Sequence, residues 1–163
     1  MLTLELEDYM KLETQCLHEG YSPKNGEPRV VPIVQSTTYR FDSTEHIARL
    51  FDMPTEFMYS RFANPTCDAV EKKLAALEGG KAALLTSSGQ AASLLSILNI
   101  CSAGESFIAA AGIYGGTVNL FGVTLKKFGI ECIWVSPDAS VEEIQKAFKP
   151  NTKAVFGETL TNP

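Results

Sequence analysis

Short apolar runs alternate with helical patterns from Pro65 onward, and this alternation is the strongest constraint on the fold. The runs predict strands at 82–87, 106–111, 131–136 and 153–159. Apolar spacing and capping residues predict one helix that starts at Pro65 and ends at Gly79-Gly80. Three further helices are predicted at 89–101, 116–129 and 140–148. Strands and helices that alternate at this spacing are typical of an α/β fold with a mostly parallel sheet and helices on its faces.

Residues 1–63 have a different character. The stretch "HEGYSPKNGEPRVVPIVQSTTYRFDS" (18–43) is rich in Pro, Gly, Ser and Thr, which predicts extended or looping chain. A short helix is expected at 43–51, with Ser43 as its cap. Such a segment buries little by itself, so we expect it to lie on a domain or on a neighbouring subunit. The predicted division is therefore an arm at 1–63 and a regular domain at 64–163.

Composition excludes several classes of protein. Hydrophobic residues make up 45% of the chain, which indicates a globular protein. The net charge of −5, with acidic and basic residues interspersed, argues against nucleic acid as a partner. No apolar run reaches transmembrane length and "MLTLELEDYM" is too acidic for a signal peptide, so neither a membrane span nor export is expected and the cytoplasm is the predicted location.

The four cysteines lie far apart without a CxxC pair, and the two histidines are isolated. Neither a bound metal nor a disulfide framework is therefore expected.

The stretch "TSSGQAA" (86–92) lies between a predicted strand and a predicted helix. The first N–H groups of a helix have no intrahelical acceptor, and Gly89 lets a ligand approach the backbone closely. This combination predicts a phosphate cradle. A tight turn without a ligand is the alternative.

Three further stretches carry side chains suited to binding. Tyr59 and Arg61 in "YSRFANPT" alternate along a predicted extended chain, so both can face one phosphate; a surface arginine paired with an acid is the alternative. Tyr114 in "AGIYGGTVNLF" follows a strand, where its ring can stack on a flat heterocycle or simply cap the core. Glu158 and Asn162 in "GETLTNP" suggest polar recognition at a strand end, although Asn-Pro also initiates turns.

The motifs "YSRxxNPT", "LEGGxAAL", "SSGQAA", "YGGTxNLF" and "ExxxNP" occur here in one order and spacing across nearly the whole chain. In this they resemble the pyridoxal-phosphate enzymes of cysteine and methionine metabolism, a fold-type I family. The resemblance implies pyridoxal 5'-phosphate as cofactor and the first part of a three-layer, mostly parallel large domain, preceded by an extended arm. It also implies a small amino-acid substrate and a site shared across a dimer, commonly within a tetramer.

The resemblance assigns roles to particular residues. Tyr59 and Arg61 would reach the cofactor phosphate of a neighbouring subunit, and the segment Ser88, Gly89 and Gln90 would bind the phosphate at the start of a helix. Tyr114 would stack on the pyridine ring and, with Tyr59, is a candidate catalytic residue. Two further cofactor-binding candidates are Glu158 and Asn162.

Within the family the chain is most similar to the O-acetylhomoserine sulfhydrylase branch, which forms homocysteine from O-acetylhomoserine and sulfide. Methionine γ-lyases usually carry a cysteine two residues after the stacking tyrosine, where this chain has Gly116. A methionine γ-lyase, a cystathionine lyase or synthase, and a non-catalytic module remain alternatives.

The family's Schiff-base lysine and its pyridine-binding aspartate lie downstream of "NP", beyond Pro163. The resemblance therefore predicts that these 163 residues are the N-terminal part of such an enzyme and are inactive alone.

Overall fold

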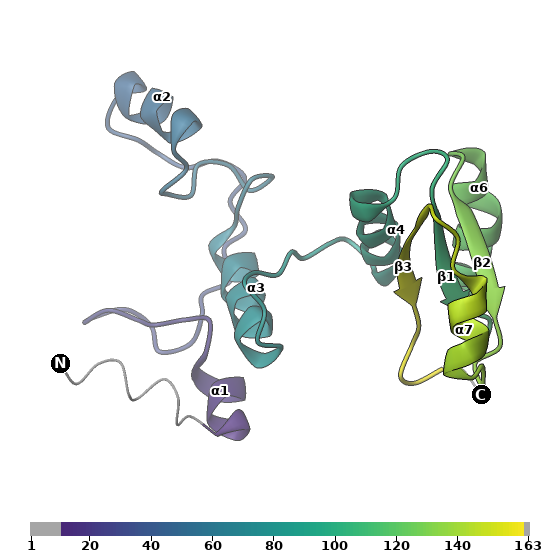
Figure 1. The fold of residues 1–163 in the computed structure, drawn as a ribbon. Helices are drawn as coiled ribbons and strands as arrows, with labels where there is room; N and C mark the ends of the chain where they lie inside the picture. The colour runs from purple at the N-terminus through teal and green to yellow at the C-terminus, as the bar shows by residue number, and fades with distance from the viewer. Residues whose placement is uncertain (1–10, 162–163) are drawn as a thin grey trace. The chain divides into compact units, whose positions relative to one another are not determined.

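The computed structural model describes residues 11–161 of the chain. The chain forms two compact units, Met1–Leu85 and Thr86–Pro163, which are described separately below (Figure 1). The division predicted from the sequence is different, with an arm at 1–63 that contacts a neighbouring subunit and a domain at 64–163. That division stays a prediction.

A parallel sheet of three strands forms the centre of the second unit. Its strands are β1 (Ser106–Ala110), β2 (Glu131–Val135) and β3 (Thr152–Phe156), in the order β2-β1-β3. Ile108 of β1 lies opposite Ile133 on one side and Val155 on the other. Because β1 is central and covered on both faces, four successive residues from Ser106 are completely buried.

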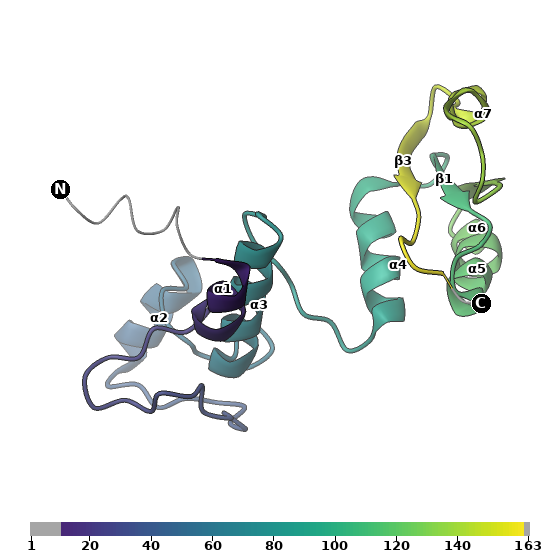
Figure 2. The same cartoon turned by 90° about the horizontal axis from the view of Figure 1, so that it is seen from below.

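Helices cover both faces of this sheet. The connection from β1 to β2 contains α5 (Gly115–Asn119) and α6 (Leu125–Lys127), and the connection from β2 back past β1 to β3 contains α7 (Val141–Ala147). Right-handed crossovers in opposite directions place their helices on opposite faces. Figure 2 shows this arrangement, with α4 (Gly89–Ile100) on the same side as α5 and α6. The predicted α/β fold with a parallel sheet and three layers is confirmed.

The core of this unit lies between the sheet and the layer of α4, α5 and α6. The completely buried ring of Phe121 packs edge-on against Phe107 of β1 and Phe156 of β3, with ring centroids 4.9 Å away in both cases. Ile97 of α4 and Leu125 of α6 complete the buried cluster. This apolar layer fixes α4 and the start of α5 against the sheet.

The predicted helix 116–129 is interrupted. Residues Leu120–Thr124 between α5 and α6 form a π-helical turn, η2. Gly122 faces the ring of Trp134, and a Cβ at Gly122 would lie 3.7 Å from Trp134 Cζ2. The predicted end at Gly129 is confirmed, because this residue has a φ of 75°, which glycine adopts easily.

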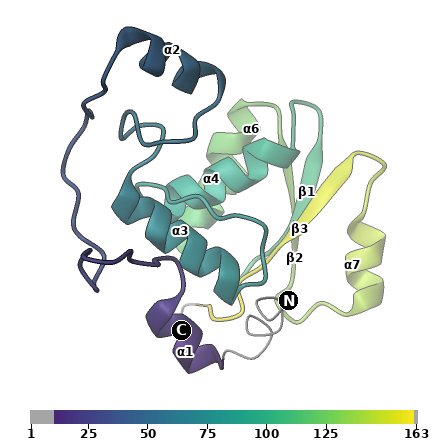
Figure 3. The ribbon, with the colours of Figure 1, turned by 90° about the vertical axis from the view of Figure 1, so that its left-hand side faces the viewer.

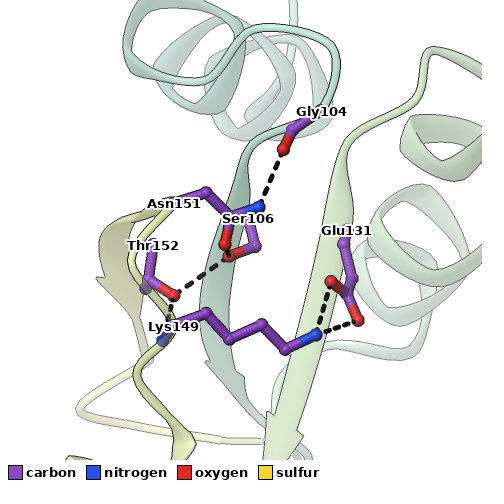
Figure 4. Close-up of polar contacts among 6 residues, drawn as sticks. All are labelled: Gly104, Ser106, Glu131, Lys149, Asn151 and Thr152. Atoms are coloured by element: carbon purple, nitrogen blue, oxygen red, sulfur yellow. Dashed lines mark hydrogen bonds and ion pairs between the residues drawn. The ribbon is translucent and has the colours of Figure 1, made fainter.

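Polar contacts hold the amino ends of the strands together (Figure 4). The completely buried Ser106 hydroxyl lies 3.0 Å from Thr152 Oγ1 and donates to Asn151 Oδ1. Asn151 Nδ2 donates to the Gly104 carbonyl over 2.7 Å. The exposed Lys149 ammonium pairs with both carboxylate oxygens of Glu131 at 2.7 Å. These contacts close the amino end of the sheet.

The first unit contains α1 (Leu12–His18), α2 (Thr44–Asp52) and α3 (Pro65–Leu77). The sequence did not predict α1, which lies beside α3 (Figure 3). Helix α2 begins after Ser43, whose hydroxyl accepts the N–H of His46 as expected for a cap. Of the described apolar residues in this unit, Leu50 and Ala69 are the buried ones, so the unit has little core of its own.

The predicted strand at 82–87 is wrong. These residues have no regular secondary structure and pair with no strand in the described chain, and the Leu84 side chain is 77% exposed. An apolar run becomes a strand only where another strand satisfies its backbone groups.

No helix of the described residues is long and apolar enough to cross a membrane.

Candidate active site at the carboxyl ends of the strands

The candidate site lies where the neighbouring strands β1 and β3 end. The segment after β1 leads to Tyr114, and the segment after β3 carries Glu158. The Tyr114 backbone N–H donates to Glu158 Oε2 over 3.1 Å. The strand order reverses at β1, and in open α/β sheets ligands bind outside the carboxyl ends at such a reversal.

The start of α4 supplies free backbone donors. Ser88 is the helix cap, and its Oγ accepts the N–H of Ala91 over 3.1 Å. The N–H groups of Gly89 and Gln90 have no protein acceptor within the described part of the chain. Nothing lies within 4 Å of the point that a Cβ of Gly89 would occupy, so a ligand could approach there. With the positive end of the helix dipole, this arrangement suits a phosphate group.

A side-chain hydrogen bond joins the starts of α4 and α5. Gln90 Nε2 donates to Oγ1 of the buried Thr117 over 3.1 Å. Sequence reasoning missed Thr117, although the "YGGT" motif contains it and a buried threonine needs a polar partner. Thr117 thus fixes the orientation of the Gln90 side chain.

The Tyr114 ring packs where Gly116 has no side chain. A Cβ at Gly116 would lie 2.5 Å from Tyr114 Cε1 and 3.0 Å from Gln90 Nε2. Tyr114 is 50% exposed, so it does not cap the core and its ring remains available to a ligand. The second unit contains Ser88, Gly89, Gln90, Tyr114 and Glu158. Within it, Glu158 is hydrogen-bonded to Tyr114, and the side chains of Tyr114 and Gln90 both lie beside Gly116.

Tyr59 and Arg61 belong to the first unit. The predicted extended chain is wrong here, because Phe62 and Ala63 both donate their N–H groups to the Tyr59 carbonyl and so close a turn. The Arg61 guanidinium lies 5.6 Å from the centre of the Tyr59 ring and 4.8 Å from that of Phe62.

Among the described residues no acid forms an ion pair with Arg61, which leaves its charge available for an anion. The remaining candidate, Asn162, lies outside the described residues.

The residues of the second unit fit pyridoxal 5'-phosphate by their chemistry. Two unpaired N–H groups at a helix start suit a phosphate, and a half-exposed tyrosine ring suits a flat heterocycle. The Ser88 hydroxyl uses a lone pair for Ala91, so its proton remains available to a phosphate oxygen.

Two curated relatives share this sequence closely. The O-acetyl-L-homoserine sulfhydrylase of Leptospira meyeri is 46% identical over 156 residues, which cover 94% of this chain and 35% of the relative. The O-acetyl-L-homoserine sulfhydrylase 1 of Thermus thermophilus is also 46% identical, over 94% of this chain and 37% of its own length. The chain therefore spans little more than a third of these relatives.

Solved structures agree with this relationship. A Campylobacter jejuni protein assigned as an O-acetylhomoserine (thiol)-lyase, which carries N'-pyridoxyl-lysine-5'-monophosphate, superposes with a TM-score of 0.85 at 37% identity. The match covers 94% of this chain and 38% of that protein. The cystathionine γ-lyase of Lactobacillus plantarum, complexed with L-serine, gives a TM-score of 0.79 at 36% identity over 94% of this chain and 38% of that chain.

The family described as Cys/Met metabolism PLP-dependent enzymes matches residues 13–163, nearly the whole chain. The order of the motifs, the α/β fold and these relatives agree with one another. The chain belongs to the Cys/Met metabolism family of pyridoxal-phosphate-dependent enzymes.

Proposed function

We propose that this protein takes part in a γ-replacement reaction, in which O-acetylhomoserine and sulfide give homocysteine and acetate. The observation that carries the proposal is the absence of a side chain at Gly116 beside Tyr114, in a chain 46% identical to O-acetyl-L-homoserine sulfhydrylases. A cysteine at position 116, as in methionine γ-lyases, would place its Cβ 2.5 Å from the Tyr114 ring. The half-exposed Tyr114 ring would have to shift to accommodate such a side chain.

In this proposal the N–H groups of Gly89 and Gln90 and the Ser88 hydroxyl hold the cofactor phosphate. The half-exposed Tyr114 ring lies against the pyridine ring, and its hydroxyl moves a proton of the substrate. Asn162 binds near the ring hydroxyl or the substrate carboxylate. When bound, the cofactor acts as an electron sink that stabilises negative charge on the substrate carbons.

Tyr59 and Arg61 are proposed to bind the cofactor phosphate of a neighbouring subunit. The first unit exposes large apolar side chains, among them Val30 at 78% and Ile33 at 80%. Exposed apolar side chains such as these are available for contact with another protein surface. The proposal therefore includes a homo-oligomer, in which residues 1–63 contact the partner. A cytoplasmic location remains part of it.

A lyase that eliminates a sulfur group is the second candidate. It is favoured by the similarity to the cystathionine γ-lyase of Lactobacillus plantarum. The two candidates share most of the cofactor site and differ in the fate of the substrate after the γ-substituent leaves.

Product analysis separates the two candidates. The protein, expressed from its complete coding region, is loaded with pyridoxal phosphate and given O-acetylhomoserine with sulfide, and in parallel cystathionine or methionine. We expect homocysteine and acetate in equal amounts from the first mixture. Formation of 2-oxobutyrate from the second mixture, faster than any homocysteine, would instead support the lyase.

A further inference from the structure

We propose that Glu158 is a positioning residue whose carboxylate fixes the backbone of Tyr114 and so sets where the Tyr114 ring meets the cofactor. The inference rests on the proposed cofactor role of Tyr114. It assigns Glu158 an indirect role, in place of a direct contact with the cofactor.

Both backbone polar groups of Tyr114 are engaged. Its carbonyl accepts the N–H groups of Thr117 over 2.8 Å and Val118 over 3.0 Å, which begins α5. Its N–H donates to Glu158 Oε2 over 3.1 Å. The first pair of bonds belongs to the helix itself, so the Glu158 contact is the one that a side-chain substitution can remove.

The Tyr114 ring is confined on one side by contacts that depend on the same backbone position. Its edge rests where Gly116 lacks a Cβ, next to the Gln90 amide. The Gln90 amide is in turn held by Thr117. Any shift of the Tyr114 backbone would therefore change how the ring packs against this small surface.

The rest of the ring lacks such support, since Tyr114 is 50% exposed. With few packed neighbours, the ring position depends on where the backbone places the Cβ of Tyr114 and on the contact beside Gly116. The segment after β3 runs toward the start of α5 (Figure 2), so Glu158 ties Tyr114 to the neighbouring strand of the sheet. This tie crosses the point where the strand order reverses.

Three variants of the protein expressed from its complete coding region test the proposal. Glu158→Ala removes the acceptor. Glu158→Gln keeps a carbonyl oxygen that can accept the same N–H without the charge. Glu142→Ala, in the exposed first turn of α7, is the matched control.

The first readout is amide hydrogen exchange of peptides covering 111–118, measured without cofactor. Loss of the acceptor should speed exchange in Glu158→Ala on the order of tenfold. Exchange in Glu158→Gln and in the control should remain close to that of the unaltered protein. Unchanged exchange in Glu158→Ala would overturn the proposal, whatever reaction the protein catalyses.

The second readout is the affinity for pyridoxal 5'-phosphate, with the circular dichroism of the bound cofactor as a report of its surroundings. We expect Glu158→Ala to weaken binding about tenfold and alter the dichroism, with Glu158→Gln close to the unaltered protein. If Glu158→Gln were as impaired as Glu158→Ala, the charge itself would be required and the positioning role would be wrong.

Faster exchange with unchanged affinity and dichroism would also overturn the proposal, because the contact would then serve the fold alone. Failure of the unaltered protein to bind the cofactor would instead contradict the proposed function. The exchange readout distinguishes that failure, since it needs no cofactor.

Discussion

At the scale of single residues, Tyr114 has two properties that suit a cofactor-binding residue. It is half exposed, and its backbone is held at both polar groups. The sequence motif identified Tyr114. The roles of its neighbours Gly116, which lies beside the Tyr114 ring, and Thr117, which binds Gln90, are seen only in the packed structure. The contact between Gln90 and Thr117 spans 27 positions, and no local pattern predicts such a pair.

Two substitutions of Tyr114 should distinguish the contribution of its ring to cofactor binding from that of its hydroxyl. Tyr114→Phe keeps the stacking surface, so its Kd for pyridoxal 5'-phosphate should stay within about twofold of the unaltered protein. Tyr114→Ala loses an aromatic contact of about 0.5–1.5 kcal/mol, which corresponds to about two- to twelvefold weaker binding. Absorbance titration measures both. Equal Kd values for the two variants would show that the ring does not stack on the cofactor.

The thiol of Cys132 should resist alkylation. Burial and, to a smaller extent, the nearby Glu131 carboxylate raise the pKa of Cys132 from 9.0 to about 12. At pH 9 about one molecule in a thousand would then carry the reactive thiolate in the folded protein. Iodoacetamide labelling followed by peptide mass spectrometry should find Cys132 modified much more slowly before unfolding than after it.

The same shift has a consequence for stability. The pKa of Cys132 is raised in the folded state, so the unfolded chain loses this proton first as the pH rises. The stabilisation is complete below pH 9 and is lost between pH 9 and about 12. Denaturant unfolding of Cys132→Val should show a shallower decline over this window. An identical decline would contradict the assigned shift.

At the scale of elements, the sheet depends on one apolar layer and one polar end. Phe121 joins η2 to β1 and β3 through two edge-on ring contacts. Phe121→Ala should lower the free energy of unfolding by about 3–5 kcal/mol, because it leaves a cavity between the helix layer and the sheet. Phe121→Leu should cost less. Chemical denaturation measures both, and a loss below about 1 kcal/mol for Phe121→Ala would place the core elsewhere.

The amino end of the sheet offers a comparison between buried and exposed polar groups (Figure 4). Asn151→Ala leaves the buried Ser106 hydroxyl and the Gly104 carbonyl with fewer partners, at a cost of about 1–3 kcal/mol. Lys149→Ala removes an ion pair between two half-exposed side chains, which contributes about 1 kcal/mol or less. Urea unfolding should therefore rank Asn151→Ala as the more harmful change. The reverse order would contradict the network.

The sequence predicted most of these elements because their signals are local. Ser140 and Glu143 form the expected capping box of α7, and Ser43 caps α2 as predicted. The failures depend on tertiary structure. The segment 82–87 has the composition of a strand but no partner strand in the described chain, and the π-turn at Leu120–Thr124 breaks a helical period that the sequence presents as continuous.

At the scale of the whole molecule, the two units differ in how they bury apolar surface. The second unit has a contiguous core, whereas the described part of the first buries only Leu50 and Ala69 among its apolar residues. Leu17, Val30 and Ile33 of the first unit are exposed. Such exposure favours a contact with another surface, which the proposal identifies as a partner subunit. Val30→Asp combined with Ile33→Asp should therefore shift the protein to a smaller species in analytical ultracentrifugation. Unchanged sedimentation would contradict an interface there.

The start of α4 is proposed to bind the phosphate of the cofactor. The most direct measurement compares the affinities of the purified protein for pyridoxal 5'-phosphate and for pyridoxal, which lacks the phosphate, in the unaltered form and in Gly89→Glu. A glutamate at position 89 would fill the open space and repel an anion. We expect much tighter binding of pyridoxal 5'-phosphate than of pyridoxal, and loss of that preference in Gly89→Glu. Equal affinity for both compounds in the unaltered protein would contradict this role of α4.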